Sequence, residues 1–323
     1  MAKKAKIRKA IWITLICLFS TVFVVSAVML INTFLAYQKA ADLYGKVRDD
    51  FYQAIEKTTG NAAETTAKVI WSRGDATTTS PLPNGTANPG DTTVTPGTGG
   101  VTTPPAGSDT TTEPPATTQP QPVYSEKFLN ACEFIRSLQK VNKDVIGYID
   151  IRFEENNKSK QISYPLLHGE DNEYYVTHAY DGSELKAGSI FLDYRCNKRL
   201  ESNHVSLIFG HNMNDGSMFQ KLTYFKQRQY FDNVNIVIYT LDGIYTYQVF
   251  SVHNTKANDG YSSIFFSSSD EYLAFIKKMQ SQSMLMGDIE LYSTDRIITL
   301  STCLNTYKDA RLAVHAVLVS IEN

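Results

Sequence analysis

The stretch TLSTCLNTYKDARLAVHAVLV, residues Thr299–Val319, holds two β-patterned runs separated by a short polar segment. A single cysteine, Cys303, ends the first run, and Arg311 opens the second. If the runs are neighbouring antiparallel strands, residues 304–310 form the loop between them and both side chains lie at the same end of the sheet. The thiolate is the reactive form of cysteine and needs a base or cation beside it. The stretch therefore predicts either a nucleophile with a charged partner or a structural thiol beside an arginine that opens an edge strand.

The region around this stretch has the composition of a mostly-β globular domain. From residue 124 to 323, short β-branched or aromatic runs begin near residues 145, 161, 174, 188, 204, 234, 244, 296 and 311. Asp242-Gly243 between two of these runs is typical of a hairpin turn. Helices are predicted over Ser125–Lys140 and over Ser269–Gln282. Many short strands with few helices favour a barrel or sandwich of about 200 residues.

The N-terminal part of the sequence predicts a membrane anchor. Residues 1–9, MAKKAKIRK, carry five basic side chains and no acid, and residues 10–36 carry no charge. A helix over this apolar run spans roughly 40 Å and crosses a hydrocarbon core of about 30 Å with some tilt. A cleaved signal peptide is the alternative, although its apolar region is shorter. The basic cluster predicts a cytosolic N-terminus, with everything after residue 36 outside the cell.

Two segments separate this span from the globular region. Residues 37–73 predict a juxtamembrane helical stalk, with a dimerising coiled coil as the alternative, because apolar residues recur every four positions: Leu43, Val47, Phe51 and Ile55. Residues 74–123 consist mainly of Thr, Pro, Gly, Ala and Ser, with four acids and no bases. Such a segment buries too little apolar surface to offset its ordering entropy. We therefore expect a disordered linker that holds the globular domain away from the membrane.

Charge and cysteine content exclude several classes of protein. The net charge is -2 and the pI is about 6.3, so no basic field predicts a nucleic-acid partner. Cys17 lies in the apolar span, which leaves Cys132, Cys196 and Cys303 for the rest of the chain. Three cysteines are too few for a disulfide scaffold. Cys132 fits the core face of its helix; a Cys132–Cys196 bridge is the alternative, and at least one thiol remains free.

His211 is the histidine whose context best fits a partner for the thiol. It follows the β-run HVSLIFG and opens a polar loop, which predicts a position at the rim of the sheet. His204 and His315 alternate with apolar residues within strands and fit packing or surface positions. The histidines lack the short Cys/His spacing of a zinc site, so we expect no metal. The guanidinium of Arg311 is always charged and could stabilise an oxyanion or orient a substrate backbone.

TLSTC at 299–303, with Arg311 downstream and GHN at 210–212, resembles the sortase family of Gram-positive surface cysteine transpeptidases. The likeness covers about residues 124–323. The sequence is similar to class B sortases in particular in three stretches: YPLLHGEDNEYYVTHAY, GSIFLDYR and GHNMNDGSMFQKLTYF. The resemblance implies a closed eight-stranded β-barrel, with an N-terminal helix and a further helix between the last long β-regions. Residues 124–323 would form the catalytic domain.

The resemblance also implies roles for individual residues. Cys303 would be the nucleophile, His211 the acid/base and Arg311 the oxyanion and substrate clamp. The residues that would contact substrate are Ser301, Thr302, Asn172, Phe209 and Tyr261. The sequence has Leu304 and Asn305 where some class B enzymes carry an acid just after the cysteine, and it lacks the Asp-Pro-aromatic lid of class C enzymes.

The function implied is that of a membrane-anchored cysteine transpeptidase. Such an enzyme cleaves a C-terminal sorting motif of surface proteins after Thr, forms a thioacyl-enzyme, and transfers the protein to an amine of peptidoglycan or to a pilin lysine. No cofactor is expected. A hydrolase that releases surface proteins and a non-catalytic sortase-like binding module are the alternatives. The expected location is the cell membrane, with a single pass through residues 10–36.

Overall fold

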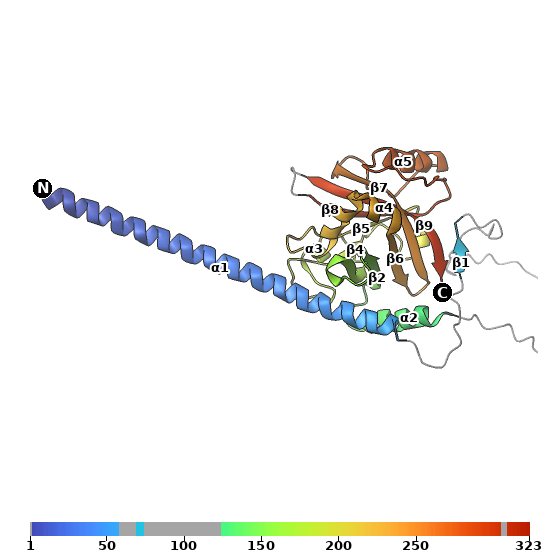
Figure 1. Cartoon of the computed structure of the whole chain (residues 1–323), viewed down its shortest axis with the longest axis horizontal. Coiled ribbons are helices and arrows are strands. Elements are labelled where there is room, and N and C mark those ends of the chain that lie inside the picture. The colour runs from blue at the N-terminus through green and yellow to red at the C-terminus, as the bar shows by residue number, and fades with distance from the viewer. Residues whose placement is uncertain (1, 58–68, 74–123, 305–308) are drawn as a thin grey trace, which may run out of the picture.

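The computed structural model describes residues 2–57, 69–73, 124–304 and 309–323. A long helix, α1 (Ala2–Ile55), runs from the N-terminus to one side of a β-barrel (Figure 1). The barrel strands are β2 (Val145–Arg152), β3 (Gln161–Leu167), β4 (Ile190–Leu192), β5 (Val205–Phe209), β6 (Asn235–Thr240), β7 (Ile244–Lys256), β8 (Ile297–Cys303) and β9 (Ala310–Glu322). The remaining α-helices are α2 (Glu126–Gln139), α3 (Tyr174–Thr177), α4 (Arg228–Asn233) and α5 (Ser269–Ser281).

The eight strands β2–β9 close into one barrel. Their order is β9-β7-β6-β2-β3-β4-β5-β8, and β8 pairs back onto β9. The pairs β3–β4 and β5–β8 are parallel, whereas the other pairs are antiparallel. Closure leaves few unpaired edge groups. The predicted mostly-β fold with a closed eight-stranded barrel is confirmed.

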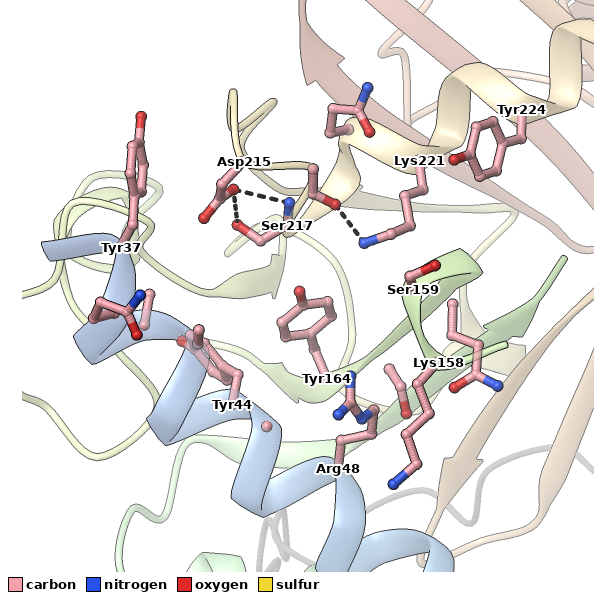
Figure 2. Close-up of a pocket in the computed structure, with 18 of the residues that line it drawn as sticks. Tyr37, Tyr44, Arg48, Lys158, Ser159, Tyr164, Asp215, Ser217, Lys221 and Tyr224 are labelled. Carbon is pink, nitrogen blue, oxygen red and sulfur yellow. Dashed lines mark hydrogen bonds between the residues drawn. The ribbon is translucent and has the colours of Figure 1, made fainter. Parts of the chain in front are cut away.

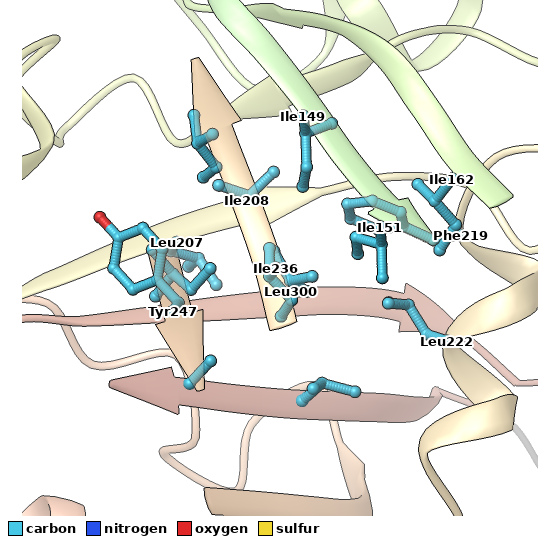
Figure 3. Packing of buried hydrophobic residues seen from close by; sticks show 14 of the residues in the cluster. Ile149, Ile151, Ile162, Leu207, Ile208, Phe219, Leu222, Ile236, Tyr247 and Leu300 are labelled. Carbon is cyan, nitrogen blue, oxygen red and sulfur yellow. The ribbon is translucent and has the colours of Figure 1, made fainter. Parts of the chain in front are cut away.

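The core fills the inside of the barrel with alternate residues of each strand. Ile149 of β2, Leu207 of β5 and Leu300 of β8 are fully buried, and their side chains gather in the interior in Figure 3. The period of two along each strand directs such residues to one face. Burial of each aliphatic side chain contributes about 1.5–3 kcal/mol. The barrel thereby supplies a rigid frame for the strand ends where the site lies.

The two helices predicted from the sequence begin at polar caps. The hydroxyl of Ser125 accepts a hydrogen bond from the backbone N of Phe128 at the start of α2. The hydroxyl of Ser268 accepts one from the backbone N of Glu271 at the start of α5. These side chains satisfy amide groups that have no partner within the helix. Both predicted helices are confirmed, and so is the hairpin at Asp242-Gly243, which joins β6 to β7.

Helix α1 combines a candidate membrane span with a helix that packs against the barrel. By its length and composition, this helix could cross a membrane. None of the residues in its most apolar window is buried inside the protein. Further along, Val47 and Phe51 are buried against the barrel. The ring of Phe51 stacks on that of Tyr148 with centroids 3.9 Å apart. The apolar stripe predicted for a stalk or a coiled coil therefore packs against the barrel, and a domain boundary at residue 124 leaves out part of the core.

The predicted helical stalk also ends earlier than residue 73. Residues Val69–Ser72 form β1, which pairs with the end of β9, with Ser72 opposite Ser320. The β8–β9 ladder ends at Val317, so the last residues of β9 have a free side that β1 takes. The structure therefore differs from the predicted helical stalk at residues 69–72, whose backbone groups pair with the free side of β9.

A second difference concerns residues 174–178, which the sequence predicts as a strand. Residues Tyr174–Thr177 form the short helix α3 instead. The carboxylate of Asp171 accepts hydrogen bonds from the backbone N of Glu173 and of Tyr174, at 2.8 Å each. An aspartate in this local pattern competes with sheet pairing and turns the chain. The predicted disordered linker, 74–123, lies outside the described residues.

Candidate active site

Strand pairing brings Cys303, Arg311 and His211 to one end of the barrel. Cys303 and Arg311 lie directly opposite each other in the antiparallel β8–β9 ladder. Strand β5 runs parallel to β8 on the other side, with Phe209 opposite Ser301. His211 follows two residues after Phe209, so it leaves the sheet beside the end of β8. His211 and Cys303 are 92 positions apart in sequence and therefore meet only through the strand topology.

A cavity of about 270 Å³ joins these three side chains. It lies at the ends of β5, β8 and β9, and its wall on the opposite side comes from the segment around α3. The residues that line it are Asn172, Val176, Phe191, Phe209, Gly210, His211, Ser301, Thr302, Cys303 and Arg311. Seven of the eight residues predicted for the site lie in this set; Tyr261 does not.

The His211 ring is held by a backbone carbonyl. Its Nε2 lies 2.7 Å from the carbonyl oxygen of Val176. Since a carbonyl only accepts, Nε2 carries the hydrogen, and Nδ1 is the atom left to exchange a proton. The backbone before the ring is fixed too: Gly210 donates to the carbonyl of Ser301 at 3.2 Å. A Cβ at Gly210 would lie 2.7 Å from the Phe219 ring, which explains the glycine before the histidine.

Cys303 differs from the other cysteines of the barrel region in its exposure. Its side chain is exposed, whereas Cys132 and Cys196 are buried and all are free thiols. The Cys132 thiol donates to the carbonyl of Thr240, and the Cys196 thiol to that of Val205. Burial raises the pKa of the Cys196 thiol to about 11, which keeps it in the unreactive form. The alternative of a Cys132–Cys196 disulfide is therefore wrong.

Tyr261 stands behind the cavity wall. It is 2% exposed, and its hydroxyl lies 2.8 Å from the hydroxyl of Ser301. Burial raises the pKa of Tyr261, and the nearby charge of Arg311 opposes that rise. The substrate contact expected of Tyr261 stays a prediction. In the structure its hydroxyl holds the Ser301 side chain, because a buried hydroxyl needs a hydrogen-bonding partner.

The remaining predicted substrate residues form the rest of the wall. The Asn172 side chain donates to the Asp193 carboxylate at 3.0 Å and accepts from the backbone N of Tyr194 at 3.1 Å. Its amide therefore holds two loops together beside the cavity. The Phe209 ring lies 5.6 Å from that of Phe191 and makes an apolar wall. The Thr302 hydroxyl is buried without a hydrogen-bond partner among the described residues.

Two contributors to the site carry no signal in the sequence. Val176 acts through its backbone carbonyl, which every residue possesses, and it lies in a segment that the sequence predicts as a strand. Phe191 lies in β4 and resembles many other buried aromatic residues. The glycine before His211 was visible, but its packing against Phe219 was not.

Comparison with known proteins gives one consistent result. The sortase domain model matches residues 166–319. Sortase B of Listeria monocytogenes is 36% identical over 195 residues, which cover 58% of this chain and 74% of that protein. Sortase B of Clostridium perfringens superimposes with a TM-score of 0.52 at 30% identity, over 57% of this chain and 98% of that structure. A complex of Staphylococcus aureus sortase B with substrate superimposes with a TM-score of 0.53 at 30% identity, over 59% of this chain and 86% of that structure.

The barrel and its cysteine-containing cavity thus define an enzyme of the cysteine transpeptidase type, a class that acts on surface proteins bearing a sorting motif. Within that class, the chain belongs to the sortase family and is a class B sortase.

Proposed function

We propose that this sortase cleaves a C-terminal sorting motif after Thr and transfers the surface protein to an amine, which belongs to peptidoglycan or to a pilin lysine. Cys303 is the nucleophile, His211 the acid/base, and Arg311 the clamp for the oxyanion and the substrate backbone. Ser301, Thr302, Asn172 and Phe209 shape the groove. The single observation that carries the proposal is the cavity in which one exposed thiol, one imidazole and one guanidinium converge.

The first half of the reaction follows from these positions. The Cys303 sulfur attacks the carbonyl carbon of the Thr residue, and its proton passes to Nδ1 of His211. The guanidinium of Arg311, across the ladder from the sulfur, stabilises the negative charge that develops on the carbonyl oxygen. The C–N bond breaks as His211 gives the proton to the departing amine. The acyl group then remains on sulfur as a thioester.

The second half reverses these proton movements. The acceptor amine attacks the thioester carbon and gives a proton to His211. The C–S bond breaks, and the sulfur recovers a proton from the imidazole. Water in place of the amine gives hydrolysis, so the outcome depends on which nucleophile reaches the thioester. In this proposal residues 10–36 anchor the chain, with the N-terminus cytosolic and the barrel outside; the basic cluster before the apolar run supports that orientation.

Mass spectrometry of the full-length chain with Pro/Thr-containing peptides tests the proposal. We expect a thioacyl adduct on Cys303 and, in the presence of an added amine, a transpeptidation product. Cys303→Ala should form neither species, whereas Cys17→Ser, which removes an exposed thiol from the span, should behave as the unmodified chain. Normal turnover by Cys303→Ala would refute the assignment of the nucleophile.

A further inference from the structure

We infer that the acceptor amine binds in a second cavity, which adjoins the thiol cavity at His211 and Val176, and that helix α1 forms one wall of it. The inference rests on the proposed function, because it concerns the second half of that reaction. The cavity has a volume of about 380 Å³. It shares His211 and Val176 with the thiol cavity but contains neither Cys303 nor Arg311.

The order of proton transfers places the acceptor on this side. The departing amine takes its proton from His211, so the peptide beyond the scissile bond extends from the thiol cavity past the imidazole. The acceptor amine must return a proton to the same nitrogen, and it attacks along the path by which the first amine left. A cavity that opens from His211 and lacks the thiol fits both the departing segment and the incoming acceptor.

Helix α1 delimits the far end of this cavity through Tyr37. Figure 2 shows the Tyr37 side chain extending from α1 toward the loop that carries Asp215 and Ser217, which continues the loop begun by His211. Hydrogen bonds to the loop between α3 and β4 fix the helix here. Lys39 Nζ donates to the carbonyl of Glu184 at 3.1 Å, and the Tyr44 hydroxyl donates to that of Gly188 at 2.6 Å.

The position of Tyr37 indicates where the acceptor comes from. It is the residue that follows the uncharged run 10–36, so this end of the cavity lies within one helical turn of the end of the candidate span. A tyrosine at this level is typical of the membrane–water interface. The cavity therefore opens near the external face of the membrane that the span crosses. This position favours an acceptor held at that face.

The polar lining indicates the chemistry of the acceptor. Lys186 is exposed and supplies a cation, while Asn212, Asn214 and Thr177 supply neutral donors and acceptors. No carboxylate belongs to the described residues that line the cavity. This set fits an amine whose molecule also carries an anionic group, either a carboxylate or a phosphate. The much larger cavity of about 760 Å³ between α1 and the barrel contains neither His211 nor Cys303 and takes no part in this step.

Acceptor kinetics of the full-length chain in nanodiscs test the inference. The probes are triglycine, which has a carboxylate, O-phosphoethanolamine, which has a phosphate, and the neutral triglycinamide. Lys186→Gln should raise the KM for whichever anionic probes use the site by up to about fivefold, the effect of losing one exposed ion pair, and leave that for triglycinamide unchanged. Lys186→Arg should restore the lower KM. Lys277→Gln, an exposed lysine on α5, is the matched control.

A second variant tests the cavity itself. Asn214→Trp places a large side chain at an exposed position of the lining and should lower the yield of transpeptidation at least tenfold relative to hydrolysis. Intact thioacyl formation with unchanged acceptor KM and unchanged product ratio in both variants would overturn the inference alone. Absence of any thioacyl adduct in the unmodified chain would overturn the proposed function and, with it, the inference.

Discussion

Substitution of Tyr44 by Phe tests whether helix α1 positions the acid/base. The Tyr44 hydroxyl contacts the carbonyl of Gly188 at 2.6 Å and the hydroxyl of Ser189 at 3.1 Å. The backbone N of Ser189 donates to the carbonyl of Tyr175, the residue before Val176. The Val176 carbonyl in turn holds Nε2 of His211. Three hydrogen-bonded steps therefore connect α1 to the imidazole.

The magnitude follows from the burial of this contact. Tyr44 is 5% exposed, and burial raises its pKa, so its hydroxyl remains a donor at working pH. Phe leaves the Gly188 carbonyl without that donor, at a cost of about 1–3 kcal/mol. For a domain of this size, each kcal/mol lowers Tm by about 2–4 °C. If half of that energy restrains Val176, kcat/KM for thioacylation falls about tenfold at the upper end, since ~1.4 kcal/mol is a factor of ten.

The matched control is Tyr52→Phe on the same helix. The Tyr52 hydroxyl donates to the Asp150 carboxylate at 2.8 Å and lies 3.1 Å from the Gln161 side-chain oxygen, both on the β2–β3 side of the barrel. Its loss should lower Tm by a comparable amount without a change in thioacylation. We would measure Tm by circular dichroism and thioacylation by quenched-flow mass spectrometry. Equal kcat/KM for the two variants would show that α1 stabilises the fold without positioning His211.

Three further predictions concern other parts of the molecule. Arg311→Lys should lower kcat/KM at least a hundredfold in a peptide-cleavage assay, because a point charge cannot reproduce the planar fork; near-normal kinetics would assign Arg311 a structural role. Phe51→Ala should cost about 3–5 kcal/mol in thermal unfolding, since its ring is fully buried against the barrel, whereas a loss below 1 kcal/mol would mean that α1 detaches readily. Burial lowers the pKa of His253 from 6.5 to about 4 and holds that of the adjacent His315 well below its ordinary value. The unfolded chain therefore binds more protons between these limits, so stability is complete above pH 6.5 and decreases as pH falls toward 4; His253→Leu should flatten this loss in melting curves, and an identical slope would contradict it.

The sequence predicts the part of the site that depends on short-range pairing. The loop between Cys303 and Arg311 is short, so two β-patterned runs on either side of it have one simple arrangement, the antiparallel ladder that the structure contains. His211 is harder to place, because the parallel β5–β8 pair joins strands far apart in the chain. Periodicity does not specify which strands pair. The rim position of His211 followed from its context, and its proximity to Cys303 followed from the resemblance to sortases.

Contacts made through the backbone or from behind the wall could not be predicted. The Val176 carbonyl that fixes the His211 tautomer is independent of residue type. Tyr261 was visible as a candidate, but its hydrogen bond to Ser301 from the buried side depends on three-dimensional packing. Residue patterns show which groups are present in a region, whereas the direction from which each group approaches requires the fold.

The relation of the barrel to the membrane changes most between sequence and structure. A stripe at every fourth residue shows that one face of α1 is buried, but it fits a partner helix or a barrel equally well. In the structure, the partner is the barrel, and the helix that carries the candidate span continues directly into this contact. At the end of α1, the Asn130 side chain of α2 donates to the carbonyl of Lys57. The same helix that carries the candidate span therefore also reaches the His211 side of the site through Tyr37 and Tyr44.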